Sequence, residues 1–172
     1  MDFISHSLKK IKPSPTMVIT AKARELRAAG EKIISLSAGE PDFDTPEHVK
    51  DAAIKAINMG YTKYTNVEGI PELKQAIVNK FKNDNEIDYN IDQVIVGVGG
   101  KQILFNALFA SLNSGDEVII PTPYWVSYPD MTILAGGNPK FLNCNEENHF
   151  KINASELDNI CLLYTSPSPR DR

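Results

Sequence analysis

The stretch that decides the fold is QVIVGVGGKQILFNALFASL, residues 93–112. Its β-branched run at residues 94–96 predicts a short strand, and its apolar run at residues 102–112 predicts a helix. The glycine-rich segment 97–101 joins the two. A strand that passes through glycines into a helix N-terminus forms an anion site, because first-turn N–H groups have no intrahelical acceptor and the helix dipole favours negative charge there.

The glycine pattern matches neither of the two common nucleotide-binding motifs. A P-loop has glycine where this chain has Ile95, and a hydroxyl residue where it has Gln102. The dinucleotide motif has its third glycine at the position of Gln102, and its ribose-binding acid ends the second strand, whereas Glu117 begins that strand here. Two interpretations remain: a site for a single phosphate group held by backbone N–H groups, or a plain tight turn.

Strand and helix signals alternate downstream of the glycines. The pattern predicts a strand at residues 117–120, a helix at residues 125–134 and a strand at residues 140–142. Strands that alternate with helices at this spacing are typical of βαβ units. We therefore expect an α/β fold with a parallel sheet covered by helices.

Upstream, the sequence predicts more helices and one strand. A helix at residues 16–29 should end at Gly30 in the left-handed conformation, and residues 33–36 should form a strand. The next helix should have Thr45 as its N-cap, Pro46 as its first residue and Gly60 at its end, and Pro71-Glu72 should open another. Their expected buried faces are Val49, Ala53, Ala56 and Ile57 in the first, and Leu73, Ala76, Ile77 and Phe81 in the second.

The composition excludes several classes of protein. The 172 residues suffice for one domain, or for one domain and part of another, and 42% hydrophobic residues indicate a globular chain. A net charge of −4 argues against nucleic acid or an anionic membrane as partner. The longest apolar run, residues 103–112, is too short to span a membrane, and the first 15 residues do not form a secretory signal. Two cysteines form no disulfide framework and three histidines lack metal-ligand spacing, so we expect a soluble, cytoplasmic protein without a metal.

The last twelve residues, CLLYTSPSPRDR at 161–172, differ from everything before them. Their alternating serine and proline cannot continue a helix or lie in a central strand. The segment resembles the conceptual translation of a transposase adaptor used in building sequencing libraries; a natural proline-rich tail is the alternative. We expect it to be a non-native tail and the protein to continue beyond residue 160 in another sequence.

Four further motifs occur in one order and at one spacing. They are SAGEPDFDTP at residues 37–46, YTKY at 61–64 with GIPEL at 69–73, GGKQ at 99–102 and PYWVSYP at 123–129. Together they resemble the N-terminal part of class I pyridoxal-phosphate aminotransferases, in the bacterial aspartate and aspartate/prephenate branch. The resemblance covers residues 8–160 and implies the fold-type I architecture, a three-layer, mostly parallel sheet with helices on both faces, incomplete in this chain.

The resemblance also implies a role for particular residues. Backbone N–H groups of Gly100, Lys101 and Gln102 would hold the phosphate of pyridoxal 5′-phosphate. Trp125 would stack on its pyridine ring and lie beside the substrate. Tyr64 would reach the phosphate of the neighbouring subunit's cofactor, which implies a homodimer.

Two more positions would bind the substrate. The backbone of Gly39 would meet the substrate carboxylate. Lys12 matches an N-terminal-arm position of prephenate-using members, where a cation suits a second carboxylate. A purely structural role stays open as the alternative for each of these residues. Gly39 would then be a turn glycine, Lys12 an exposed lysine, Trp125 a core tryptophan and Tyr64 a surface tyrosine.

The same resemblance implies a division of the chain and an activity for the complete enzyme. Residues 1–45 would form the N-terminal arm and the first part of the small domain, and residues 46–160 the first part of the large cofactor-binding domain. The complete enzyme would transfer an amino group between aspartate or glutamate and a 2-oxo acid. The Schiff-base lysine lies beyond residue 160 in this family, so we expect this chain to be inactive by itself. The alternatives are a prephenate, aromatic or alanine-type aminotransferase of the same fold, or a non-catalytic phosphate-binding module.

Overall fold

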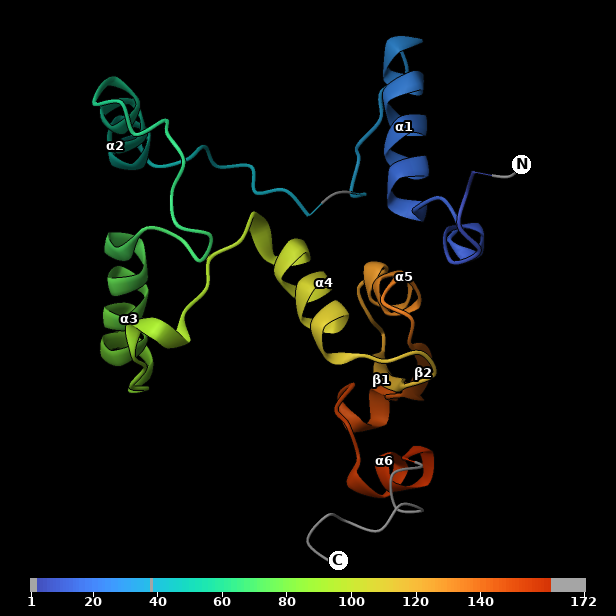
Figure 1. The fold of residues 1–172 in the computed structure, drawn as a ribbon. Coiled ribbons are helices and arrows are strands. Elements are labelled where there is room, and N and C mark those ends of the chain that lie inside the picture. The colour runs from blue at the N-terminus through green and yellow to red at the C-terminus, as the bar shows by residue number, and fades with distance from the viewer. Residues whose placement is uncertain (1–2, 38, 162–172) are drawn as a thin grey trace, which may run out of the picture. The chain divides into compact units, whose positions relative to one another are not determined.

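The structure is a computed structural model that describes residues 3–37 and 39–161 (Figure 1). The chain divides into two compact units. The central unit comprises residues 38–103, and the sheet unit comprises the stretches before and after it. Residues 162–172, which make up nearly all of the predicted non-native tail, lie outside the described residues.

The sheet unit contains one βαβ motif. Strand β1 (Glu117–Thr122) pairs in parallel with β2 (Asn138–Asn143), and helix α5 (Ser127–Leu134) connects them. The predicted strands at residues 117–120 and 140–142 and their parallel order are confirmed. The described part of the chain is therefore an α/β structure with a two-stranded parallel sheet.

The core of this unit centres on the two strands, with Leu142 on the side of helix α6 (Ala154–Ile160). Ile120 from β1, Leu142 from β2 and Met131 from α5 are buried. Thr132 is the most deeply buried side chain among the described residues, and its hydroxyl donates a hydrogen bond of 2.9 Å to the carbonyl of Tyr128 in the preceding helical turn. This bond satisfies the hydroxyl, which is the only polar group of the Thr132 side chain. The side chain can therefore be buried without leaving a polar group unpaired.

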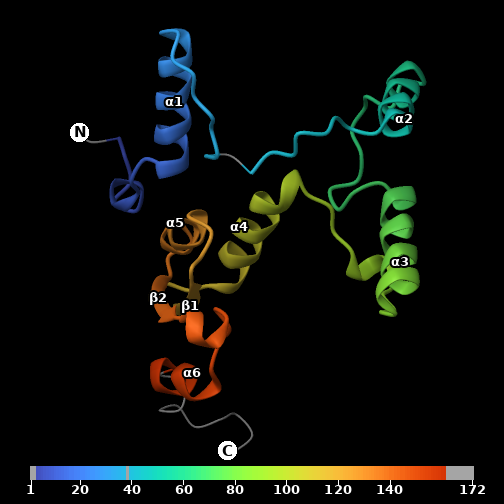
Figure 2. The ribbon, with the colours of Figure 1, turned by 180° about the vertical axis from the view of Figure 1, so that it is seen from behind.

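A second helix covers the other side of the strands. Helix α6 (Ala154–Ile160) follows the short 3₁₀ helix η3 (Glu146–Asn148), and the two views show α5 and α6 on either side of the strand pair (Figures 1 and 2). The side chain of Asn153 accepts a hydrogen bond from the N–H of Ser155, which caps the start of α6. The layered arrangement expected of an α/β protein is thus present around this small sheet.

The sheet unit also includes the N-terminal elements. A 3₁₀ helix, η1 (Leu8–Lys10), precedes helix α1 (Pro15–Ala28). Proline occupies the first position of α1, where a missing N–H costs nothing, and Gly30 has a φ of 90° just after its end. The predicted helix at residues 16–29 and its left-handed glycine are confirmed.

The central unit is helical. It contains α2 (Glu47–Asn58), α3 (Pro71–Asn85) and the 3₁₀ helix η2 (Ile91–Gln93), and α4 (Gly99–Ser111) begins in it. Each predicted helix is present. The start of α2 differs from the prediction, since Pro46 is the N-cap and the Thr45 side chain makes no capping bond. Pro46 has a ψ of 141°, which is extended rather than helical, so the first helical residue is one position later than predicted.

The buried face of α3 is rotated from the predicted one. Leu73 is 43% exposed, whereas its neighbour Lys74 is only 7% exposed. Lys74 stands three, four and seven residues before Ile77, Val78 and Phe81, which are also shielded from solvent. The four form one helical stripe in which the aliphatic stem of a lysine takes the place of an apolar side chain. The predicted face of α2 is likewise exposed, with Val49 and Ile57 open to solvent.

Two predicted strands are absent. Residues 33–36 and 94–96 are extended but are not strands in the described structure. A strand exists only when a neighbouring strand accepts and donates its backbone hydrogen bonds. The side chains of Ile34 and Leu36 are 90% and 92% exposed, and Val96 N–H bonds to the carbonyl of Glu68 in a loop. The three-layer sheet implied by the resemblance is therefore present only as the β1–β2 pair in the part described.

No helix in the described ranges is both long and apolar enough to cross a membrane.

We expect the 172-residue chain alone to aggregate. Large apolar side chains are open to solvent on α2 and α4, including Ile54 at 57% and Phe109 at 66%. Exposed apolar surface of this kind favours association. Size-exclusion chromatography with light scattering should show polydisperse material, and Phe109→Gln should raise the soluble fraction. The matched change at a buried position, Met131→Gln, should lower the soluble fraction. A sharp cooperative melt from a monodisperse sample of the unsubstituted chain would contradict the expectation.

Candidate functional site

The glycine loop at residues 97–99 shapes the start of α4. Gly99 has a φ of 78°, in the left-handed region, and its N–H donates a bond of 3.0 Å to the carbonyl of Gly97. A Cβ added at Gly97 would collide with the Cδ1 of Ile103. The chain therefore makes its turn into α4 where Gly99 must tolerate a positive φ and where a side chain at Gly97 would have to displace Ile103.

The first turn of α4 contains the residues predicted to hold a phosphate group. Gly100, Lys101 and Gln102 all lie in it, so the structure brings these three predicted residues together. Gly100 is the second residue of the helix, and its N–H precedes the first intrahelical hydrogen bonds of α4. A Cβ added at Gly100 would meet no atom within 4 Å, so the space beside its backbone is open to a ligand. The N-terminus of a helix favours an anion such as phosphate.

A close contact anchors the segment that leads into the loop. The N–H of Val96 donates a bond of 2.9 Å to the carbonyl of Glu68. Gly69 has a φ of 107°, and a Cβ added there would lie 2.8 Å from the Cγ2 of Val96. Lys74 supports this contact, since its ammonium lies 4.0 Å from the carboxylate of Glu68. Glycine at position 69 thus lets the two backbones approach, and the contact holds the residues just before the glycine loop.

Tyr64 lies in the loop between α2 and α3 of the same unit. Its side chain is fully exposed and forms one wall of a hollow of about 500 Å³. The other lining residues are Gly60, Tyr61, Lys63, Thr65, Ile70 and Glu72. An exposed phenol at the rim of a hollow can donate a hydrogen bond to an incoming group.

Trp125 lies in the sheet unit, in the turn between β1 and α5. It follows the carboxyl end of β1, which is where ligands bind in open parallel sheets. Its indole meets the ring of Tyr128 edge-on, with centroids 5.5 Å apart and an angle of 89°. Tyr124 stacks on Phe141 at 5.1 Å and ties the same turn to β2. These two ring contacts hold the indole in one orientation while 40% of the residue stays exposed.

The two predicted substrate residues lie in extended segments. Gly39 is exposed in the central unit, and a Cβ added there would meet no atom within 4 Å. Lys12 is exposed in the sheet unit, between η1 and α1. Of the predicted residues, Gly39 and Tyr64 belong to the same unit as the glycine loop, whereas Lys12 and Trp125 belong to the other.

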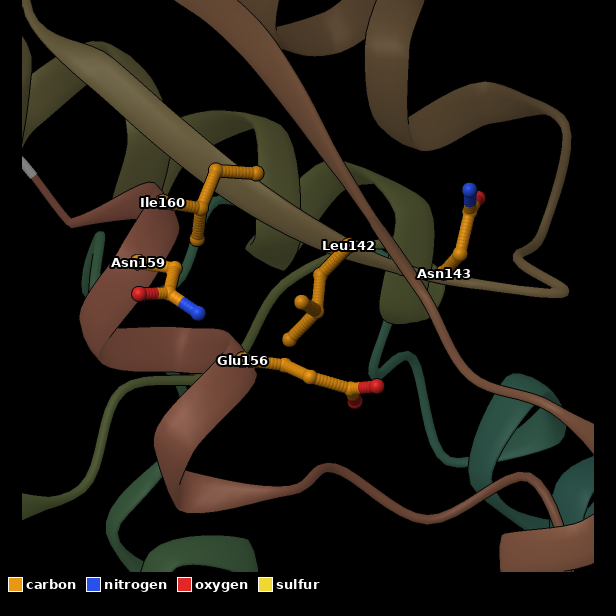
Figure 3. A pocket seen from close by; sticks show the side chains of 5 residues that line it. All are labelled: Leu142, Asn143, Glu156, Asn159 and Ile160. Atoms are coloured by element: carbon orange, nitrogen blue, oxygen red, sulfur yellow. The ribbon is translucent and has the colours of Figure 1, made fainter.

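A second hollow lies between β2 and α6 in the sheet unit (Figure 3). In Figure 3, Glu156 extends across it and the amide of Asn159 reaches into the same space, while Asn143 points away. The Oε2 atom of Glu156 is buried and has no hydrogen-bond partner among the described residues. This hollow contains none of the predicted site residues, and we do not include it in the candidate site.

Comparison with known proteins gives the glycine loop and the turn after β1 a family context. The family model described as aminotransferase class I and II matches residues 31–168. The chain belongs to this family. It is 60% identical over 174 aligned residues to the "probable aspartate/prephenate aminotransferase" of Rickettsia conorii, covering 98% of this chain and 43% of that protein. It is 58% identical to the aspartate/prephenate aminotransferase of Cereibacter sphaeroides, covering 92% and 40% respectively. This aminotransferase chain is therefore of the aspartate/prephenate branch.

Solved structures agree with this assignment. The aspartate aminotransferase of Thermus thermophilus with maleate matches with a TM-score of 0.89 and 45% identity, over 94% of this chain and 42% of that one. The aspartate aminotransferase of Rhizobium meliloti matches with a TM-score of 0.87, over 99% and 41%. The fold is thus a part of the aminotransferase fold, and the aminotransferase chain spans less than half the length of these relatives. Pyridoxal phosphate is the cofactor of the family.

Sequence reasoning missed two features of the site. One is Lys74, whose charge disguised its place in the buried stripe of α3; its spacing from Ile77, Val78 and Phe81 was the available signal. The other is the side chain of Gln102, whose Oε1 accepts a hydrogen bond from the N–H of Val98. Its spacing of four residues from Val98, across the glycines, was visible in the sequence, but the bend that makes this contact was not.

We expect a larger residue in place of Gly97 to destabilise the protein, whereas a larger residue in place of Gly100 should have little effect. The measurement uses a full-length hybrid in which residues 1–160 replace the matching part of the Rickettsia conorii relative. Gly97→Ala should lower the stability of the hybrid by about 1–3 kcal/mol, because the added carbon overpacks Ile103. Gly100→Ala is the matched control and should change stability by less than about 0.5 kcal/mol, because its Cβ has open space. Equal melting temperatures for the two variants would contradict the collision.

Proposed function

We propose that the complete protein transfers an amino group between aspartate or glutamate and a 2-oxo acid, with pyridoxal 5′-phosphate as cofactor. The observation that carries the proposal is the glycine loop at the start of α4, with open space beside Gly100, in a chain of the aminotransferase family. The relatives named above are an aspartate and an aspartate/prephenate aminotransferase by name. Their names support the aspartate substrate, and prephenate is the second candidate.

The residues of this chain would bind and orient the cofactor. Backbone N–H groups of Gly100, Lys101 and Gln102 would hold its phosphate at the positive end of α4. Trp125 would lie flat against its ring, with Tyr128 holding the indole edge-on. When bound, pyridoxal phosphate supplies an electron sink for the substrate's α-carbon. The proton is moved at that carbon by a lysine that the resemblance implies beyond residue 160.

The remaining roles follow from the same proposal. Gly39 would present its backbone to the α-carboxylate, because a glycine lets a ligand approach the chain closely. Tyr64 would donate its phenolic hydrogen to the phosphate of the neighbouring subunit's cofactor, so the complete protein would act as a homodimer. We expect it in the cytoplasm. Residues 1–45 would belong to the arm and small domain, and residues 46–160 to the large domain. A small non-catalytic phosphate-binding module is the competing interpretation, and an inactive hybrid would favour it.

A test of the proposal compares the 172-residue chain with the hybrid defined above. The purified chain should form no 2-oxo acid from aspartate, because the implied lysine is absent from it. The hybrid should bind pyridoxal phosphate with a visible absorption band and convert aspartate and 2-oxoglutarate. The unmodified Rickettsia conorii relative is the control for assay and folding. A folded hybrid without cofactor absorption would overturn the proposal, and activity of the 172-residue chain would overturn the placement of the lysine.

Lys12 provides a test of substrate class. We expect Lys12→Met in the hybrid to lower kcat/KM for prephenate about three- to tenfold, the effect of losing one charged hydrogen bond at a partly exposed site. Substrates with a single carboxylate should be converted as before. Lys10→Met is the matched control, since it removes a neighbouring lysine from the same N-terminal segment. The same loss for one- and two-carboxylate substrates would show that Lys12 does not read the second carboxylate.

A further inference from the structure

The side chain of Gln102 folds back over the glycine loop. Its Oε1 accepts a hydrogen bond from the N–H of Val98, which lies one residue before the left-handed Gly99. The same oxygen would lie 3.0 Å from a Cβ at Gly97. A single side chain in the first turn of α4 thus closes the loop by holding the residue in its middle.

This contact satisfies a group that the loop would otherwise leave open. The N–H of Val98 lies before the helix and belongs to no strand among the described residues, so no regular element provides its acceptor. Gln102 provides it from four residues later in the chain. Because the N–H of Gly99 already bonds to Gly97, the two bonds together define the path of residues 97–99.

The choice of glutamine has a physical reason. A serine or threonine at position 102 has a side chain too short to reach back over the loop, and a glycine has none. A glutamate could accept the same bond, but it would add a negative charge in the turn that is proposed to hold a phosphate. Glutamine gives the reach and the acceptor without that charge. Gln102, one of the residues that distinguish this loop from the P-loop and dinucleotide motifs, is therefore also the residue whose side chain holds the loop in place.

We propose that Gln102 is a positioning residue whose side chain shapes the glycine loop for the phosphate, and thereby sets the preference for the phosphorylated cofactor over its unphosphorylated form. The inference rests on the proposed function, since it concerns the same phosphate site. It is independent of the backbone N–H of Gln102, which any residue at this position retains. The side chain acts through Val98 and the path of the loop.

The test compares the affinities of the hybrid for pyridoxal phosphate and for pyridoxal, which lacks only the phosphate. Gln102→Met keeps the length of the side chain and removes the acceptor. Its affinity for pyridoxal phosphate should fall about three- to tenfold, as expected for one lost hydrogen bond, while its affinity for pyridoxal stays unchanged. Hydrogen exchange of the Val98 amide should become faster in the same variant, and Gln102→Glu should restore slow exchange because it restores the acceptor.

Gln93→Met is a matched control in the same unit. Gln93 also accepts a backbone hydrogen bond through Oε1, from Asn90 N–H at 2.8 Å, but it does so in the capping box of η2. This variant should bind both ligands as the unsubstituted hybrid does. Equal losses for the two ligands in Gln102→Met, or an unchanged ratio, would overturn the inference. An unsubstituted hybrid with no preference for the phosphorylated ligand would overturn the phosphate site, and the inference with it.

Discussion

The turn into α4 is the constraint on which the candidate site depends. Helix α4 begins directly after a sharp bend, in which Gly99 has a positive φ and a side chain at Gly97 would have to displace Ile103. The same bend leaves open space beside the backbone of Gly100 in the first turn. The sharp turn of the backbone and the proposed phosphate site therefore depend on the same glycine loop.

The central unit is built to hold this turn. Gly69 allows the loop before α3 to approach Val96 closely, and the carbonyl of Glu68 accepts the N–H of that residue. Lys74 lies beneath, with its stem in the stripe of α3 and its ammonium 4.0 Å from Glu68. Removing the Glu68 carboxylate would leave the shielded Lys74 cation with less compensation for its burial. Helix α3 thus holds the loop before it through one ion pair, and that loop makes the close backbone contact with Val96.

The sheet unit shows how a short sheet can place an aromatic side chain. β1 and β2 run parallel, so their carboxyl ends lie at one edge, and the turn that follows β1 carries Trp125 to that edge. The ring contacts of Tyr124 with Phe141 and of Trp125 with Tyr128 orient the turn. The aromatic residues around 123–129 thus act as a group, and the predicted role of Trp125 depends on its neighbours as much as on its own ring.

Local signals in the sequence determined the helices, the β1–α5–β2 order and the glycine loop. Proline, glycine and apolar spacing act within a few residues, which is why the helix at 71–85 and the left-handed Gly30 could be predicted. Tertiary structure alone decided which face of α3 is buried, because Lys74 lies beside the loop at Glu68 and Gly69, which the spacing of apolar residues does not reveal. It also decided that residues 94–96 form no strand in the described chain, since a strand needs a neighbour to share its hydrogen bonds and Val96 finds only the carbonyl of Glu68.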